Sequence, residues 1–216
     1  MYRYFVTGTD TDVGKTRVVA ALGRALVRSG NAPRIVKIVQ TGVRGGEPGD
    51  AERAGRLASC SSVELTRFSA PADPYNAALA QGARPLAAAQ LASEIESIEG
   101  PVVAEGSGGL LVPINEREHL GDVAAAAGLE TIVVVGLRMG CINHALLTVS
   151  ALAGLGVPVA GAVLVERWQP LPRPHHDGVV RALQGKMKIL GIVPFAEDEA
   201  ASVVSGARIF ESLFAT

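Results

Sequence analysis

The sequence predicts an α/β protein with a doubly wound, mainly parallel sheet flanked by helices. Short apolar segments rich in β-branched residues alternate with longer segments rich in Ala and Leu. Several short segments are apolar at consecutive positions, which is typical of parallel strands buried on both faces. Hydrophobic residues make up 48% of the chain and charged residues 19%, which excludes general disorder. The 216 residues contain no repeat or long linker, so we expect a single domain over residues 1–216.

The order of the expected elements follows from these patterns. The predicted strands are Tyr4–Thr7, Arg34–Val39, Val102–Ala104, Thr131–Gly136, Val159–Val165 and Ile189–Val193. The predicted helices are Lys15–Ser29, Asp50–Ala58, Leu86–Ile98, Asp122–Ala127, Asn143–Leu155 and Gly178–Gln184. The segments Gly42–Gly49 and Gln169–Asp177 are expected to be surface loops.

Charge and composition exclude several classes of partner. The formal net charge is −1 and aromatic residues make up 4%, so we expect neither nucleic acid nor an anionic membrane as a partner. The uncharged stretch Ala145–Val165 is long enough to span a bilayer, but Gly154–Pro158 predicts a helix stop and a turn inside it. We therefore expect a buried helix and a buried strand there. Cys60 and Cys141 form no CxxC motif, and a cytoplasmic location is expected.

A glycine-containing loop between the first strand and the first helix predicts a phosphate-binding site. The loop reads Gly8-Thr9-Asp10-Thr11-Asp12-Val13-Gly14-Lys15-Thr16, and a helical apolar pattern follows it. Backbone N–H groups at a helix start point at phosphate oxygens, and the helix dipole favours that charge. In such a loop Lys15 reaches the β and γ phosphates, and the Thr16 hydroxyl can bind Mg²⁺. Gly8 lies one residue earlier than the standard spacing, so the loop is a longer variant.

Two acidic residues are candidates for holding the metal. Glu105 ends a predicted strand and precedes Gly106-Ser107-Gly108-Gly109, which allows the backbone to approach phosphates or substrate. Asp50 follows the loop Gly42–Gly49 and is either a second ligand or only a helix N-cap. Mg²⁺ prefers oxygen ligands and keeps some waters, so one hydroxyl and one or two carboxylates suffice.

A second lysine interrupts a strand that is otherwise apolar. Lys37 lies near the carboxyl end of Arg34–Val39, where open α/β sheets bind ligands. An ion inside a parallel sheet is costly unless it is paired. Lys37 is therefore either a paired charge in the site or a side chain that extends past an edge strand to solvent.

Two further segments contain polar groups. Gly140-Cys141-Ile142-Asn143-His144 opens an uncharged helix, whose free N–H groups could hold a carboxylate. For the side chains we expect Cys141 to be a small buried residue and His144 to lie on the helix surface. His175-His176-Asp177 has no third ligand nearby, so we expect a solvated loop.

Together these motifs resemble the dethiobiotin synthetase family of the biotin pathway. The resemblance rests on the long phosphate loop, Lys37 with Gln40-Thr41-Gly42, Glu105–Gly109 and Gly140–His144, in the same order from residue 4 to about residue 195. It implies a P-loop NTPase-like fold and an ATP-dependent ligase that closes a ureido ring on 7,8-diaminononanoate with CO₂, ATP and Mg²⁺. The implied route passes through a carbamate and a carbamic–phosphoric anhydride. The resemblance also implies a homodimer with sites at the subunit interface.

The resemblance assigns roles to matching positions of this sequence. It implies that Lys37 and Lys15 are catalytic, with Lys37 holding the carbamate. The implied metal ligands are Thr16, Asp50 and Glu105. The implied substrate contacts are Thr11, Lys37, Thr41, Gly108, Gly140 and Cys141. The implied nucleotide contacts are Asp12, Val13, Gly14, Lys15, Thr16, Arg17, Asp50, Glu105, Gly106, Ser107, Gly108, Val165, Glu166, Val193, Pro194 and Phe195.

The chain departs from the family pattern at three positions. Ile38 follows Lys37 where the family usually has Pro, and Ser107 stands where Ala is usual. Val165 stands where better-known members have an Asn that reads adenine. Because valine cannot make those hydrogen bonds, we expect weak discrimination between nucleotide bases.

Two other classes share this kind of domain. An amidotransferase synthetase of the cobyrinate class needs a glutaminase domain with a nucleophilic Cys, and 216 residues leave no room for it. A partition-type ATPase switch has an extra lysine early in its phosphate loop, whereas positions 9 to 13 here are Thr, Asp, Thr, Asp and Val.

Overall fold

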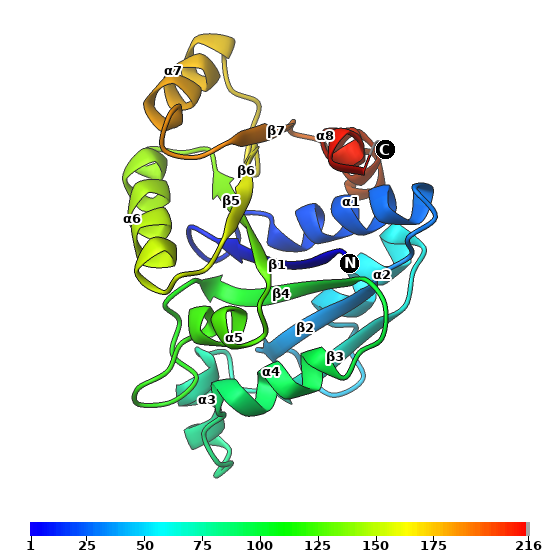
Figure 1. Ribbon diagram of the computed structural model, residues 1–216, viewed down its shortest axis with the longest axis vertical. Coiled ribbons are helices and arrows are strands. Elements are labelled where there is room, and N and C mark those ends of the chain that lie inside the picture. The colour runs from blue at the N-terminus through cyan, green and yellow to red at the C-terminus, as the bar shows by residue number, and fades with distance from the viewer. Residues whose placement is uncertain (215–216) are drawn as a thin grey trace.

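A seven-stranded parallel sheet forms the centre of the computed structural model, which describes residues 1–214 (Figure 1). The strand order is β3-β2-β4-β1-β5-β6-β7, and every neighbouring pair is parallel. The strands are β1 (Arg3–Gly8), β2 (Arg34–Thr41), β3 (Ser62–Phe68), β4 (Val102–Gly109), β5 (Glu130–Gly136), β6 (Val159–Val165) and β7 (Ile189–Val193). The helices are α1 (Lys15–Arg28), α2 (Asp50–Ala58), α3 (Pro74–Ala80), α4 (Ala88–Glu96), α5 (Leu120–Ala126), α6 (Cys141–Gly154), α7 (Arg173–Leu183) and α8 (Glu199–Phe214).

Helices cover both faces of the sheet, and each face has its own apolar core (Figure 1). One core lies beneath α1, α2 and α8, and the other lies beneath α3 to α7. Neighbouring strand residues divide between them: Phe5 joins the second core and Val6 the first, and both are fully buried. This alternation explains why the strands are apolar at consecutive positions, as expected for a doubly wound sheet.

The strand order places the carboxyl ends of β1 and β4 side by side at the point where the winding direction reverses. From β1 the chain passes over β4 to reach β2, whereas from β4 it passes over β1 to reach β5. In open α/β sheets, ligands bind outside the carboxyl ends of the strands at such a reversal. The loop after β1 and the last residues of β4 are therefore where a ligand site is expected.

The six strands expected from the sequence are present, with small shifts in their bounds. The expectation for Val102–Ala104 was too short, because β4 continues through Glu105 to Gly109 and pairs with Gly8 after an irregularity in β1. The strand β3 was not predicted. Its residues are half-buried on an edge of the sheet, so its sequence lacks the long apolar run of the inner strands.

Two helices that the sequence analysis did not predict have recognisable start signals. Asp73 caps α3 by accepting a hydrogen bond from the backbone N–H of Asn76, and Pro74 follows it. Asp198 accepts hydrogen bonds from the backbone N–H groups of Ala200 and Ala201 at the start of α8. In α8, Phe210 is fully buried in the core that α1 shares.

The expected loop Gln169–Asp177 is partly wrong. Helix α7 already begins at Arg173, with Pro172 before it and Pro174 inside its first turn. A proline in the first turn is compatible with a helix because its missing N–H would have had no intrahelical acceptor. His175 and His176 are half-buried in α7, so the expected solvated loop at these histidines is also wrong.

The uncharged stretch Ala145–Val165 forms most of α6 and all of β6, as expected. Within residues 1–214, the chain contains no helix with the length and apolar character needed to cross a membrane.

Candidate functional site

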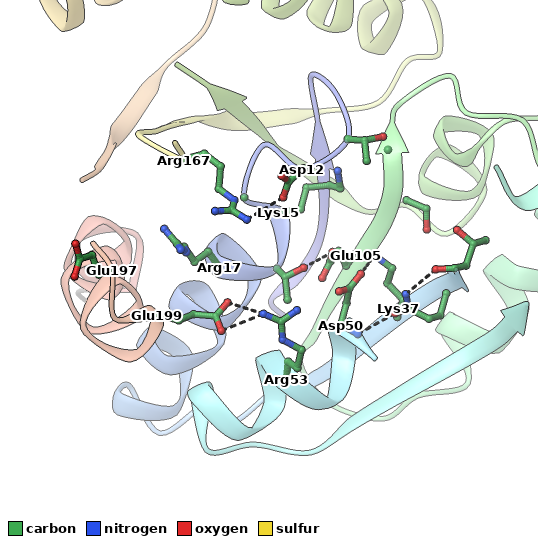
Figure 2. A pocket seen from close by; sticks show the side chains of 17 residues that line it. Asp12, Lys15, Arg17, Lys37, Asp50, Arg53, Glu105, Arg167, Glu197 and Glu199 are labelled. Atoms are coloured by element: carbon green, nitrogen blue, oxygen red, sulfur yellow. Dashed lines mark hydrogen bonds and ion pairs between the residues drawn. The ribbon is translucent and has the colours of Figure 1, made fainter. Parts of the chain in front are cut away.

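A polar cavity of about 500 Å³ opens at the carboxyl ends of β1, β2 and β4 (Figure 2). Twelve residues expected from the sequence line it: Thr11, Asp12, Gly14, Lys15, Thr16, Arg17, Lys37, Thr41, Asp50, Glu105, Ser107 and Gly108. The remaining lining residues are Gln40, Arg53, Arg167, Glu197 and Glu199. The cavity therefore unites segments that are distant in the sequence, from the phosphate loop to the start of α8.

The phosphate loop crosses from β1 to α1 with a tight turn at Gly14. Its φ of +100° is one that L side chains rarely adopt, and a Cβ there would lie 3.0 Å from Cγ1 of Val165. Helix α1 then begins at Lys15, so its free N–H groups point at the cavity. The Lys15 Nζ donates a hydrogen bond to the carbonyl of Asp10 at 2.9 Å. This geometry fits a bound phosphate chain.

Lys37 is buried between two carboxylates. Its Nζ lies 2.9 Å from Oε1 of Glu105 and 2.7 Å from Oδ2 of Asp50, and it donates to the Gly106 carbonyl at 3.2 Å. The Lys37 side chain is 4% exposed and that of Glu105 is 1% exposed. Of the two possibilities that the sequence left open, Lys37 is thus the paired charge within the site.

Asp50 is the first residue of α2, and Gly49 occupies the N-cap position. The Asp50 backbone N–H donates to Oε1 of Gln40 at 2.8 Å, which fixes the start of the helix against β2. Its side chain is then free to pair with Lys37, so Asp50 is a site residue rather than only a cap.

Burial and charge act on the two lysines in opposite ways. Burial lowers the pKa of Lys15 to about 8, although the negative charge of Glu105 partly counteracts it. Burial would also lower the pKa of Lys37, but Glu105 and Asp50 outweigh it and raise that pKa above its ordinary value. The charge of Lys37 correspondingly holds the pKa of Asp50 below its usual range, against the effect of burial.

The oxygen atoms beside Lys37 fit Mg²⁺. The Thr16 hydroxyl donates to Oε1 of Glu105 at 2.9 Å. Asp50 lines the same cavity as these two residues. Oε2 of Glu105 is buried and has no hydrogen-bond partner in the described part of the chain. Hydroxyl and carboxylate oxygens are the ligands that Mg²⁺ prefers, and a buried carboxylate oxygen without a partner is costly. Thr16, Asp50 and Glu105 would therefore hold the ion.

The side of the cavity away from Lys37 also contains residues that no motif pointed to. Arg167 follows β6 and lies 3.0 Å from Oδ1 of Asp12, and Arg53 lies 3.2 Å from Glu199 (Figure 2). Outside the cavity lining, Arg138 pairs with Asp10 of the phosphate loop. These contacts are long-range in the sequence, so only the folded chain reveals them.

Nine expected site residues do not line this cavity. They are Val13, Gly106, Gly140, Cys141, Val165, Glu166, Val193, Pro194 and Phe195. Val165 packs beneath Gly14 and is fully buried. The Glu166 carboxylate accepts hydrogen bonds from the backbone N–H groups of Leu171 and Phe195 and pairs with His176 at 2.8 Å. These contacts, against the effect of burial, lower the pKa of Glu166. Its carboxylate holds the loop after β6.

The fold and the phosphate loop together define a P-loop nucleotide-binding protein. A family model described as an AAA domain matches residues 2–202. The cell division ATPase MinD of Pyrococcus furiosus aligns with a TM-score of 0.61 at 16% identity, covering 99% of this chain and 100% of that chain. A ParA family ATPase of Chlorobium tepidum aligns with a TM-score of 0.59 at 14% identity, covering 98% and 91%. At such identities the likeness shows the fold alone.

Relatives with higher sequence identity show which family of nucleotide-binding proteins the chain belongs to. An ATP-dependent dethiobiotin synthetase of Anaeromyxobacter dehalogenans is 43% identical over 167 residues, which is 74% of each chain. Another, of Nitrosospira multiformis, is 36% identical over 217 residues and covers 94% of this chain and 92% of that one. The chain belongs to the dethiobiotin synthetase family.

We predict that Lys37→Met lowers the free energy of unfolding by about 3–5 kcal/mol in the absence of Mg²⁺, because Glu105 keeps a buried charge without its partner. Urea unfolding followed by circular dichroism measures the loss. Mg²⁺ should stabilise this variant more than the parent protein, since the ion can take the place of the ammonium between the carboxylates.

Arg28→Met is the control, because it removes an ion pair with Glu211 in which both side chains are more than half exposed. We expect it to cost less than about 1 kcal/mol. Equal losses in the two variants would contradict a special role for the buried pair.

Proposed function

We propose that this one domain closes the ureido ring of dethiobiotin from 7,8-diaminononanoate, CO₂ and ATP, in the cytoplasm. The observation that carries the proposal is the buried Lys37, which lines the same cavity as Lys15 of the phosphate loop. Two lysines at one cavity suit a reaction between two anions that would otherwise repel each other. The relatives named as ATP-dependent dethiobiotin synthetases support this choice of substrates.

The proposed reaction has three steps. One amine of the diamine adds to CO₂ and loses a proton, which gives a carbamate. A carbamate oxygen then forms a bond to the γ-phosphorus, and the bond from that phosphorus to the ADP oxygen breaks. Finally the second amine attacks the carbamate carbon and loses a proton, a C–N bond forms, and phosphate leaves with the former carbamate oxygen and takes up that proton.

The protein contributes position and charge to these steps rather than a covalent nucleophile. Lys15 binds the β and γ phosphates, and Lys37 binds the carbamate close to them. Thr16, Asp50 and Glu105 would hold Mg²⁺, which when bound would neutralise charge on the phosphates. Thr11, Thr41 and Gly108 line the same cavity and contact the diamine.

We predict that phosphate release from ATP and Mg²⁺ requires both bicarbonate and the diamine, because the carbamate is the group that accepts the phosphoryl. A coupled phosphate assay with each component omitted in turn measures this, and mass spectrometry identifies the ring product. Lys37→Met should lose about 10²-fold or more in turnover, as for removal of other charge-stabilising groups, while still binding ATP.

Phosphate release that ignores the diamine and CO₂ would sink the synthetase proposal. It would favour the ATPase switch, whose fold MinD and ParA share with this chain.

We further propose that the Gly140–Asn143 turn binds the carboxylate of the substrate across a homodimer interface. Gly140 has φ +86° and precedes α6, whose N-terminus offers free N–H groups. Gly140 and Cys141 do not line the cavity of their own chain. A second cavity of about 320 Å³ lies between the phosphate loop, β4 and α6, and the exposed side chains of Leu111 and Leu147 border it. Exposed apolar residues beside the site suit a subunit contact.

We predict that Leu147→Glu converts the homodimer to a monomer, because it places a charge in the apolar contact. Analytical ultracentrifugation measures the mass. Turnover should fall with the dimer while ATP still binds, since the phosphate loop belongs to one chain. A dimer of unchanged affinity in this variant would place the interface elsewhere.

We predict turnover within about tenfold for ATP, CTP and GTP, which is the scale of one lost amide hydrogen bond. Val165 has no polar group and packs beneath Gly14, and the Glu166 carboxylate is occupied by its own loop. Steady-state rates with each nucleotide at saturating diamine test this. A preference for ATP of a hundredfold or more would refute it.

A further inference from the structure

The cavity has five cationic side chains, and they differ in whether a carboxylate neutralises them. Lys37 pairs with Asp50 and Glu105, Arg53 pairs with Glu199, and Arg167 pairs with Asp12. Within residues 1–214, Lys15 and Arg17 make no ion pair with a carboxylate. These two cations are thus available for an anion that enters the cavity.

The burial of Arg17 is only partly offset by other groups of the protein. Its side chain is half-buried, and its Nη1 is buried without a hydrogen-bond partner among the described residues. Burial, and after it the positive charge of Arg167, lower the pKa of Arg17. A guanidinium with a buried unpaired N–H beside a like charge destabilises the fold. Such a cost persists at functional sites when a ligand supplies the missing partner.

The place of Arg17 shows which part of a ligand it would meet. Thr16, Glu105 and Lys37 mark the end of the cavity where the metal and the reacting phosphate lie. Figure 2 shows Arg17 on the opposite side of Lys15 from Lys37, on the same side as Arg167. A phosphate chain that has its γ group beside Lys37 therefore has its α group beside Arg17.

We propose that the guanidinium of Arg17 binds the α-phosphate of the nucleotide, so that the nucleoside end is held by charge instead of by its base. Arg167 supports this by neutralising Asp12, whose carboxylate would otherwise repel the phosphates. Glu197 lies on the far side of Arg17 from Lys15 in Figure 2, away from the phosphate chain. The proposal rests on the proposed function only in taking a nucleoside triphosphate as the ligand.

Nucleotide binding without diamine tests the proposal. Isothermal titration calorimetry with Mg²⁺ and ATP, CTP or GTP should show that Arg17→Gln raises Kd by about tenfold or more, as for a lost hydrogen bond between charged groups. The factor should be the same for the three bases. The Kd of Arg17→Lys should lie between that of the parent and that of Arg17→Gln, because lysine keeps the charge but lacks the planar guanidinium that matches phosphate.

Arg28→Gln is the control, because it removes the same charge from the same helix at a residue that pairs with Glu211 and does not line the cavity. We expect its Kd to stay within about threefold of the parent, on the scale of an exposed ion pair. An equal loss in both variants would show that only the general field matters and would overturn the contact. A loss for one base but not the others would also overturn it, since Arg17 would then read the base.

Thermal unfolding separates this role from a structural one. Without nucleotide, the Tm of Arg17→Gln should equal or exceed that of the parent, because the variant loses a poorly solvated charge. The rise in Tm on adding ATP and Mg²⁺ should shrink. A lower Tm without nucleotide and an unchanged rise with it would overturn the proposal. Failure of ring closure would leave these binding results intact, so the two proposals fail separately.

Discussion

The buried contact between Lys37 and Glu105 is the interaction on which the geometry of the site depends. Strands β2 and β4 are neighbours whose register sets these two residues directly opposite each other. An ammonium inside a parallel sheet must be paired, and a single carboxylate leaves it with unused donors. Asp50 supplies the second partner. Its position requires α2 to begin at Asp50, whose backbone N–H is held by the side-chain oxygen of Gln40. Thr16 donates to the same Glu105, so the phosphate loop, α2 and β4 meet at one carboxylate.

This arrangement favours ligand binding at some cost to the stability of the protein alone. Lys37 and Glu105 are buried charges, and the charge of Asp50 lies beside them. Burial removes the hydration of these charges, and in many proteins this cost is about as large as the free energy gained from their attraction. Here Oε2 of Glu105 still has no partner, and burial lowers the pKa of Lys15. A metal ion and a phosphate chain supply the groups that these atoms lack. Ligand binding therefore offsets the free energy that burying these groups costs.

Much of this could be predicted from the sequence because the signals were local. Consecutive apolar residues indicated the inner strands, and the loop from Gly8 to Thr16 indicated the phosphate site. A lysine within an apolar strand left two possibilities, a paired charge or a side chain that extends to solvent, and the structure shows the paired charge. Edge strand β3 was missed because its half-buried residues give a weaker pattern. The position of Val165 at the end of β6 could be matched to the family, but the direction of its side chain could not. Successive side chains of β6 point to opposite faces of the sheet, and the packing of β6 beside the phosphate loop decides which of them meets Gly14. In the structure it is Val165.

The two ends of the cavity differ in how precisely their ligand-binding side chains must be positioned. The end with the metal needs oxygen ligands in a narrow range of positions, so a hydroxyl, two carboxylates and a lysine must all be held by rigid elements. The nucleoside end only has to hold a charged chain, and an arginine on a long side chain can do so from several places. Motifs therefore define the residues of the first end more closely than those of the second. The resemblance already implied that Arg17 contacts the nucleotide, but the pairing of the other arginines and of Lys37 is what shows that its guanidinium is available for a phosphate.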